Sequence, residues 1–451
     1  MTEPTFGALD GGDLPLFTDL YELTMLQGYF EQGHNPRATF DLFVRDLPPD
    51  RGYLIAAGLE QVVAYLDGLS FDGEAIDYLA EQGFNDGFLD WLAGFEFTGD
   101  VRAVPEGTAV FPDEPIIEVT ATIMQAQLLE TMLINQVAFQ SLIATKAARM
   151  RHVVDEKGDG QSLVDFGSRR AHGTDAGVKA ARAAYIGGFD GTSNVAAGRD
   201  FDIKVFGTMA HSWIQSFETE EEAFRAYVES YGEDSILLVD TYDTLEGAEL
   251  AADVADEMDV DIRGVRIDSG DLAGLSRQVA GETGLDVFVS SGLDEYAITE
   301  FFEDGGVATG FGVGTNLVTS ADAPTLEGVY KLVAVERDGE LRPTMKLSQG
   351  KVTYPGRKTV HRVERDGRFQ KDVIALQDED IRGEELLVDI YDAGDRVYDL
   401  PSLDAVRSRR ERSLSKLPEG VQRIRSPATY PVSPSEGLER ETERLREELA
   451  R

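Results

Sequence analysis

The sequence contains no cysteine, which excludes disulfide bonds, a thiolate nucleophile and any zinc site built on cysteine ligands. It also contains no run of about 18 apolar residues, so no segment is predicted to span a membrane. The first residues are acidic and rich in glycine, unlike a signal peptide. We therefore expect a cytoplasmic protein.

Positive charge is scarce: 42 lysines and arginines stand against 83 aspartates and glutamates, and only ten of the 42 are lysines. The net charge of −41 argues against nucleic acid or an anionic membrane as a partner. Such acidity is typical of proteins kept soluble in concentrated salt, where ions screen the repulsion between like charges. The composition therefore predicts a halophilic protein.

Three kinds of pattern divide the chain. Residues 1–120 mix helical spacing with short alternating segments, which predicts an α+β region, and residues 325–400 are expected to return to it. In residues 121–324 apolar strand-like runs alternate with helix-like stretches, which predicts a parallel sheet. A barrel is favoured there over an open doubly wound sheet. Residues 401–451 are charged and predicted to form a helical C-terminal extension.

Six polar loop motifs follow successive predicted strands. They read DFGSRRAHG, GTSN, GTMAHSW, VDTYDT, RIDSGDL and GVGTNL, at residues 165–173, 191–194, 207–213, 239–244, 266–272 and 312–317. Loops of glycine with serine or threonine present backbone amides to phosphate oxygens. A single loop of this kind is more often an ordinary turn. Most of these six loops are of this kind, and six polar loops at successive strand ends favour a phosphate-rich ligand.

Side chains in these motifs suggest chemistry. Phe166 offers a flat ring beside the guanidiniums of Arg169 and Arg170, which suits a ligand with both a ring and an acid group. Near phosphates, His211 is able to act as a nucleophile toward a phosphoryl group, whereas a lone histidine elsewhere is usually structural. Asp268 is able to bind sugar hydroxyls or, through water, Mg²⁺; its alternative is an Asx turn. The histidines show no metal-ligand spacing, so no metal is predicted to be ligated directly by protein.

Taken together, the motifs resemble the nicotinate phosphoribosyltransferases from about residue 16 to 356. TDLYELTM, VSSGLDE and MKLSQGKVTYPG also match, and all motifs run in the family's order. The resemblance leaves the last 50 or so residues uncovered. It implies an irregular α/β barrel of the type II phosphoribosyltransferase kind, packed on a split α+β N-terminal domain, with a charged helical C-terminal tail.

The resemblance also implies a reaction. Nicotinate and phosphoribosyl pyrophosphate would give nicotinate mononucleotide and pyrophosphate in NAD biosynthesis, coupled to hydrolysis of the co-substrate ATP, with Mg²⁺ as cofactor. His211 matches the histidine that ATP phosphorylates, and Asp268 matches the ribose-binding acid; both are implied to be catalytic. A homodimer with shared active sites is implied too.

The remaining site residues follow from the same resemblance. Nicotinate binding is implied for Tyr21, Phe166, Arg169, Thr208 and Arg266. In this arrangement the pyridine lies between Phe166 and the partner subunit's Tyr21. Phosphoribosyl and pyrophosphate binding is implied for Ser193, Gly292, Gly314, Thr315, Ser348 and Lys351.

Three alternatives stay open. The first is a nicotinamide or quinolinate phosphoribosyltransferase; the related nicotinamide enzymes carry an acid at the position of Ser193, and its absence favours nicotinate. The second is a sugar-phosphate barrel lyase or isomerase, for which Lys204 is the one barrel-strand lysine able to form a Schiff base. The third is a non-catalytic nucleotide sensor, which would have no use for His211.

If the acidity is an adaptation to salt, the free energy of unfolding falls when salt is removed, because repulsion between carboxylates is then less screened. Urea unfolding at about 0.1 M and about 1 M potassium chloride, where the Debye lengths are about 10 Å and about 3 Å, measures the change. Equal stability at the two concentrations would contradict the prediction.

Overall fold

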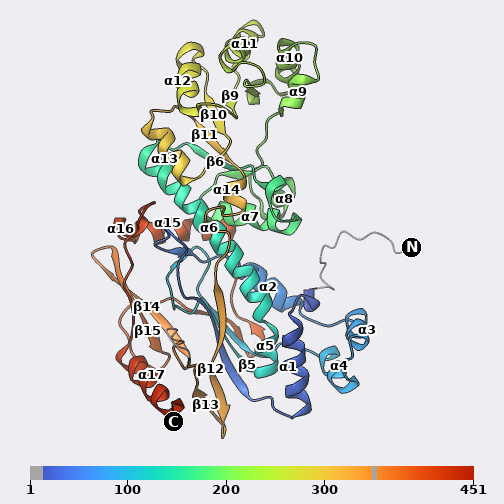
Figure 1. The fold of residues 1–451 in the computed structure, drawn as a ribbon, viewed down its shortest axis with the longest axis vertical. Coiled ribbons are helices and arrows are strands. Elements are labelled where there is room, and N and C mark those ends of the chain that lie inside the picture. Colours follow the sequence, from blue (N-terminus) through green and yellow to red (C-terminus); the bar gives the residue numbers. More distant parts are fainter. Residues whose placement is uncertain (1–13, 348–352, 451) are drawn as a thin grey trace. The chain divides into compact units, whose positions relative to one another are not determined.

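The structure is a computed structural model that describes residues 14–347 and 353–450. The chain divides into two compact units, which we call unit one and unit two (Figure 1). Unit one comprises the described residues of Met1–Leu142 and Thr325–Arg451, and unit two comprises Ile143–Pro324. The long helix α6 (Glu130–Lys157) begins in unit one and ends in unit two. The predicted mixed α/β class is confirmed.

Unit one is built on a seven-stranded sheet of order β13-β12-β1-β5-β3-β17-β18. β1 lies between β12 and β5 and is antiparallel to both, so segments about 290 residues apart pair in one sheet. Two smaller sheets have the orders β16-β14-β15-β19 and β2-β4. The strands are β1 (Arg37–Val44), β2 (Leu54–Ile55), β3 (Asp100–Ala103), β4 (Ala109–Val110), β5 (Ile117–Thr122), β12 (Gly328–Arg337), β13 (Glu340–Pro343), β14 (Lys358–Arg365), β15 (Arg368–Leu376), β16 (Glu384–Glu385), β17 (Val388–Asp392), β18 (Asp395–Arg396) and β19 (Val432–Pro434).

Helices complete unit one. They are η1 (Leu14–Leu16), α1 (Leu20–Glu31), α2 (Leu59–Gly68), α3 (Gly73–Glu81), α4 (Asp86–Ala93), α5 (Ile123–Leu128), α15 (Leu403–Lys416), α16 (Glu419–Gln422) and α17 (Glu436–Leu449). The charged helices near the end each bury a narrow apolar face, with Leu414 of α15 and Leu438 of α17 among the buried residues. None of the described helices combines the length and apolar character needed to cross a membrane.

Unit two is built on a six-stranded sheet of order β7-β6-β11-β10-β9-β8, in which every pair is parallel. The strands are short and largely buried, as expected for a parallel sheet covered on both faces. They are β6 (Ser162–Asp165), β7 (Gly191–Thr192), β8 (Ile236–Leu238), β9 (Gly264–Ile267), β10 (Val287–Ser290) and β11 (Gly310–Val313). The helical segments between and after them are η2 (Ser168–Arg170), α7 (Thr174–Ile186), α8 (Val195–Phe201), α9 (His211–Gln215), α10 (Glu220–Tyr231), η3 (Gly232–Asp234), α11 (Thr244–Glu257), α12 (Leu272–Thr283), α13 (Glu295–Glu303) and α14 (Thr315–Val318).

The predicted barrel is not closed. The strand order is that of a barrel opened between β7 and β8, because β11 pairs with β6 and the other neighbours follow chain order. Residues 203–206, predicted as a further strand, contribute one isolated parallel bridge between Thr192 and Val205. With only two residues in β7 and three in β8, few backbone groups are available to pair across the opening.

The parallel sheet fixes where the polar loops lie. Because all six strands run the same way, the loops that follow them gather at one edge of the sheet, as ligand sites do in α/β proteins. Asp243 and Asp271, in two of these loops, accept hydrogen bonds from the first N–H groups of α11 and α12 and therefore act as helix caps.

Candidate active site

The carboxylate of Asp165, the last residue of β6, joins two loops. The Gly167 N–H donates to its Oδ1 and the Thr192 hydroxyl donates to its Oδ2, each at 2.7 Å. The Ser193 N–H donates to the Asp165 carbonyl at 2.7 Å. Burial raises the pKa of Asp165, and the two bonds to its carboxylate oppose that rise. The loop that carries Phe166 and the loop that carries Ser193 are thus held together.

The Phe166 ring rests on β11, where alternate residues are glycine. A Cβ on Gly312 would lie 2.4 Å from Phe166 Cδ2, and a Cβ on Gly310 would lie 2.7 Å from Phe288 Cε2. The Phe166 and Phe288 rings contact each other, with their centroids 5.8 Å apart and an angle of 41° between planes. The glycines therefore make room for an aromatic pair, of which sequence reasoning missed Phe288. The Gly-Phe-Gly sequence of β11 was the signal that could have predicted it, because glycines at alternate positions leave space for rings on one face of the strand.

A cavity of about 220 Å³ opens where β6, β9, β10 and β11 end. Its lining comprises Phe166, Arg169, Arg170, Arg266, Asp268, Ser290, Ser291, Gly292, Leu293, Gly312, Gly314, Thr315 and Asn316. The guanidiniums of Arg169 and Arg170 have no hydrogen-bond or ion-pair partner among the described residues. Both are therefore available to a carboxylate or phosphate in the cavity.

Hydrogen bonds to the loop after residue 206 fix the position of the Arg266 guanidinium. It donates to the Thr208 hydroxyl at 2.7 Å and to the Met209 carbonyl at 3.1 Å, while its Nε is buried without a partner. Burial lowers the pKa of Arg266, and Asp268 and Asp240 oppose that change. The guanidinium thus ties the cavity to the loop that leads to α9.

Two carboxylates follow β8 and β9: Asp268, which lines the cavity, and Asp240, which contacts the Asp268 loop. Asp268 accepts a hydrogen bond from the Ser290 hydroxyl at 2.6 Å. Asp240 Oδ2 accepts from the Asp268 N–H at 3.0 Å and from the Ser269 hydroxyl at 2.6 Å. Asp240 Oδ1 is buried and has no hydrogen-bond partner within the described chain. The sequence alone does not show whether Asp240 contacts a neighbouring loop or caps a helix, since aspartates that follow strands do both.

His211 is the first residue of α9. Its Nδ1 lies 3.1 Å from the Thr241 hydroxyl, and its Nε2 lies 3.9 Å from Asp240 Oδ1. The side chain is 40% exposed. The imidazole is therefore oriented by the loop after β8 yet open to a ligand from solvent.

The predicted site residues fall into four groups. Phe166, Arg169, Arg266, Asp268, Gly292, Gly314 and Thr315 line the one cavity. Thr208 contacts that set through Arg266, His211 lies beside Asp240, and Ser193 is held by Asp165. Tyr21 lies on α1 in unit one, with 47% of its surface exposed. Ser348 and Lys351 lie outside the described residues.

Comparison with known proteins identifies the family. Three family models match the chain: the N-terminal domain of nicotinate phosphoribosyltransferase at residues 16–138, the nicotinate phosphoribosyltransferase family at 161–376 and its C-terminal domain at 380–441. The chain belongs to the nicotinate phosphoribosyltransferase family. The C-terminal match extends the likeness well beyond residue 356, into the part that the motifs did not cover.

Individual relatives agree with this membership. The chain is 45% identical to nicotinate phosphoribosyltransferase pncB2 of Mycobacterium tuberculosis over 442 residues, which cover 96% of this chain and 94% of the relative. It is 40% identical to nicotinate phosphoribosyltransferase of Bacillus subtilis over 461 aligned residues, covering 94% and 93%. The crystal structure of human nicotinic acid phosphoribosyltransferase matches with a TM-score of 0.83 and 29% identity, covering 95% and 99%.

The double role of Asp165 as acceptor predicts a stability effect. Asp165→Ala leaves the Gly167 N–H and Thr192 hydroxyl without their acceptor, and we expect it to lower the free energy of unfolding by about 2–4 kcal/mol. Asp165→Asn keeps an amide oxygen and is expected to lose less. Urea unfolding measures both. Asp243→Ala, which removes a helix cap, is the control and should cost about 1 kcal/mol; equal losses for the three variants would contradict the prediction.

Proposed function

We propose that this protein is a nicotinate phosphoribosyltransferase that converts nicotinate and phosphoribosyl pyrophosphate into nicotinate mononucleotide and pyrophosphate, coupled to ATP hydrolysis, in NAD biosynthesis. The observation that carries the proposal is the single cavity in which Phe166, Arg169, Asp268 and Thr315 meet. It combines a flat wall, an unpaired cation, a sugar-binding acid and a backbone turn suited to phosphate. Family membership supports the same reaction.

Nicotinate binding is proposed at the Phe166 end. The ring of Phe166 stacks on the pyridine, and the guanidinium of Arg169 binds the carboxylate. Arg266 and Thr208 support this side of the cavity through their mutual hydrogen bond. We propose that the partner subunit's Tyr21 closes the other face of the pyridine in a homodimer.

Phosphoribosyl transfer is proposed beside Asp268, the carboxylate in the cavity lining. The pyridine nitrogen attacks the anomeric carbon, the carbon–oxygen bond to pyrophosphate breaks, and its electron pair leaves with pyrophosphate. Asp268, oriented by Ser290, binds the ribose hydroxyls and stabilises the positive charge that develops on the sugar. Gly292, Gly314 and Thr315 surround the 5-phosphate, and Ser193 lies on the neighbouring loop.

The leaving pyrophosphate requires cations. Ser348 and Lys351, which lie outside the described residues, are proposed to bind it. Mg²⁺ is proposed as a second source of charge: the unpartnered buried Oδ1 of Asp240 and the carboxylate of Asp268 are the oxygen donors that suit it. No three His, Asp or Glu side chains of the described chain come together as a ligand set, so these acids would hold Mg²⁺ through water and phosphate oxygens. When bound, Mg²⁺ supplies charge neutralisation to the leaving group.

ATP coupling is proposed to act through His211. An imidazole nitrogen attacks the γ-phosphorus of ATP, the bond from that phosphorus to the bridging oxygen breaks, and ADP leaves; water later cleaves the phosphorus–nitrogen bond. Thr241 and Asp240 support this role because they orient the ring while it stays exposed. Phosphorylation of His211 would place negative charge beside Asp240, which accepts a hydrogen bond from the Asp268 N–H. This contact would link ATP hydrolysis to phosphoribosyl transfer.

The finer architecture belongs to the same proposal. We propose that residues 121–324 act as an incomplete α/β barrel of the type II phosphoribosyltransferase kind, that residues 1–120 and 325–400 form the supporting domain, and that 401–451 is its helical extension. The strand order of unit two supports the barrel relationship. A cytoplasmic location is proposed from the same reaction.

The alternatives have less support. No acid occupies the position of Ser193, which favours a carboxylate substrate over nicotinamide. Lys204, the Schiff-base candidate of a sugar-phosphate lyase, is exposed, and its ammonium lies 4.7 Å from the Phe206 ring centroid rather than in the cavity lining. The exposed, oriented imidazole of His211 argues against a sensor without chemistry.

The direct test incubates the purified protein with nicotinate, phosphoribosyl pyrophosphate and Mg²⁺, with and without ATP. We expect nicotinate mononucleotide in both cases and more of it with ATP. Nicotinamide and quinolinate are tested in parallel. Preferred conversion of either one, or no product from any of the three, would refute the proposal.

Replacing His211 should separate ATP coupling from transfer. His211→Ala is expected to lose ATP stimulation and keep some basal transfer, because the cavity that holds the two substrates is unchanged. Product formation and ADP release measured together give the coupling. His34→Ala, at an exposed histidine outside the six loop motifs, is the matched control. Unaltered ATP stimulation in the His211 variant would remove that residue from the mechanism.

Replacing Arg169 should weaken the binding of nicotinate more than the binding of phosphoribosyl pyrophosphate. Loss of a charge-assisted hydrogen bond costs about 1.5–3 kcal/mol, so Arg169→Ala is expected to raise the KM for nicotinate about tenfold or more. The KM for phosphoribosyl pyrophosphate should change less, and Arg169→Lys should recover part of the loss. Initial rates over a range of each substrate give both constants. An unaltered nicotinate KM would assign the carboxylate to another cation.

A further inference from the structure

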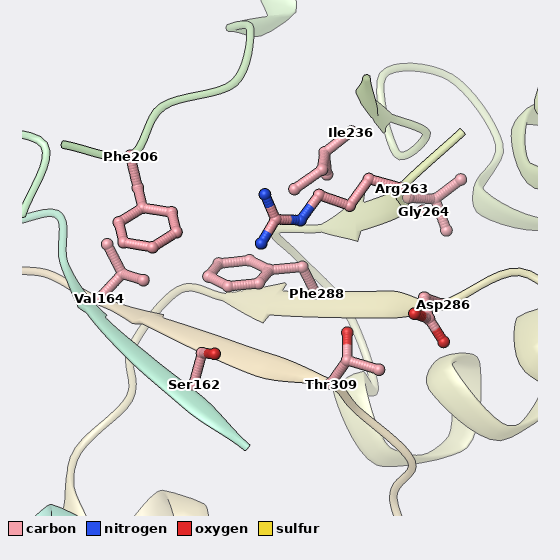
Figure 2. Close-up of a pocket in the computed structure, with 10 residues that line it drawn as sticks. Ser162, Val164, Phe206, Ile236, Arg263, Gly264, Asp286, Phe288 and Thr309 are labelled. Atoms are coloured by element: carbon pink, nitrogen blue, oxygen red, sulfur yellow. The ribbon is translucent and has the colours of Figure 1, made fainter. Parts of the chain in front are cut away.

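A second cavity lies at the opposite end of the same parallel strands (Figure 2). Its volume is about 210 Å³, and its walls include Ser162 and Ile236, the first residues of β6 and β8. The candidate active site lies where the strands end, whereas this cavity lies where they begin. It is therefore separate from the residues assigned above to phosphoribosyl transfer.

The walls of this second cavity combine aromatic and aliphatic side chains with polar ones. Figure 2 shows the Phe206 and Phe288 rings facing the same space, with Val164 and Ile236 at its sides. Two hydroxyls, of Ser162 and Thr309, also face the cavity. Flat rings beside aliphatic groups favour a flat apolar ligand over a sugar or a nucleotide phosphate.

One cation enters the second cavity. The guanidinium of Arg263 extends across it toward the two phenylalanine rings (Figure 2), and it has no hydrogen-bond or ion-pair partner in the described part of the chain. The carboxylate of Asp286 also lines the cavity, at the end distant from the guanidinium (Figure 2). The Lys204 ammonium lies 4.7 Å from the Phe206 ring centroid and adds positive charge nearby. The guanidinium of Arg263 is the lining group able to bind an anion.

Two phenylalanine rings in contact with each other lie between the two cavities. Phe166 lines the candidate active site and Phe288 lines the second cavity, and their rings contact each other at 5.8 Å. Both rings rest on the glycine positions of β11, Gly310 and Gly312. A ligand in the second cavity would thus contact Phe288, whose ring touches the Phe166 ring that lines the candidate active site.

We propose that this second cavity binds a small planar aromatic monocarboxylate, with the ring between Phe206 and Phe288 and the carboxylate on Arg263. The proposal rests on the proposed function only in taking nicotinate as the natural member of that class. The volume of about 210 Å³ accommodates a single aromatic ring that carries one acid group. A single guanidinium matches one carboxylate bidentately.

The test is a calorimetric titration of the full-length protein with nicotinate, repeated with benzoate, which lacks the ring nitrogen. We expect two binding events per chain. Arg263→Met should weaken one of them about tenfold or more, and Arg169→Ala should weaken the other. Ile236→Trp, which fills the cavity without changing charge, should remove the same event as Arg263→Met. Arg199→Met, at an exposed arginine of unit two paired with Asp200, is the control for charge and should retain both.

Three results would overturn the proposal: a single binding event in the unaltered protein, an unchanged second event in Arg263→Met, or displacement of benzoate from that site by inorganic phosphate. The transfer assay separates this proposal from the previous one. Binding that depends on Arg263 without mononucleotide formation would refute the proposed function and keep the site. Normal transfer with one binding event would refute the site alone.

Discussion

The parallel pairing of β6 with β11 is the contact on which the candidate site depends. It places Asp165 opposite Val313, and the Phe166 N–H donates to the Val313 carbonyl at 2.8 Å. Two loops almost 150 residues apart in sequence therefore begin side by side. The ring of Phe166 and the turn at Gly314 face one cavity because their strands are hydrogen-bonded neighbours.

Fully or partly buried carboxylates extend this arrangement to neighbouring loops. Asp165 holds the loop after β7, Asp240 holds the loop after β9, and Asp268 accepts from the last residue of β10. Each accepts backbone or hydroxyl donors, so the burial of its charge is offset by hydrogen bonds. The result is a preorganised site whose cations, Arg169 and Arg170, are left for a ligand.

Sequence reasoning succeeded where local pattern and strand direction suffice. It predicted the parallel strands and the loop motifs after them, and most of the residues implied by the resemblance line one cavity. The irregular barrel it predicted stays a prediction, because the six parallel strands of unit two form a sheet that is not closed. Sequence reasoning missed Phe288, since a phenylalanine in an apolar strand looks like an ordinary core residue.

The sequence alone determined which chemistry is possible: its lack of cysteine excluded thiol and disulfide chemistry, and its ordered motifs specified the family. Only the tertiary structure distinguished the buried side chain of Asp240, which accepts from the loop after β9, from the exposed Asp243, which caps α11. It alone revealed that Arg263 lies beside two rings and has no partner among residues 14–347 and 353–450. The physical reason is that hydrogen-bond partners and cavities arise from segments distant in the chain, whose meeting no local pattern records.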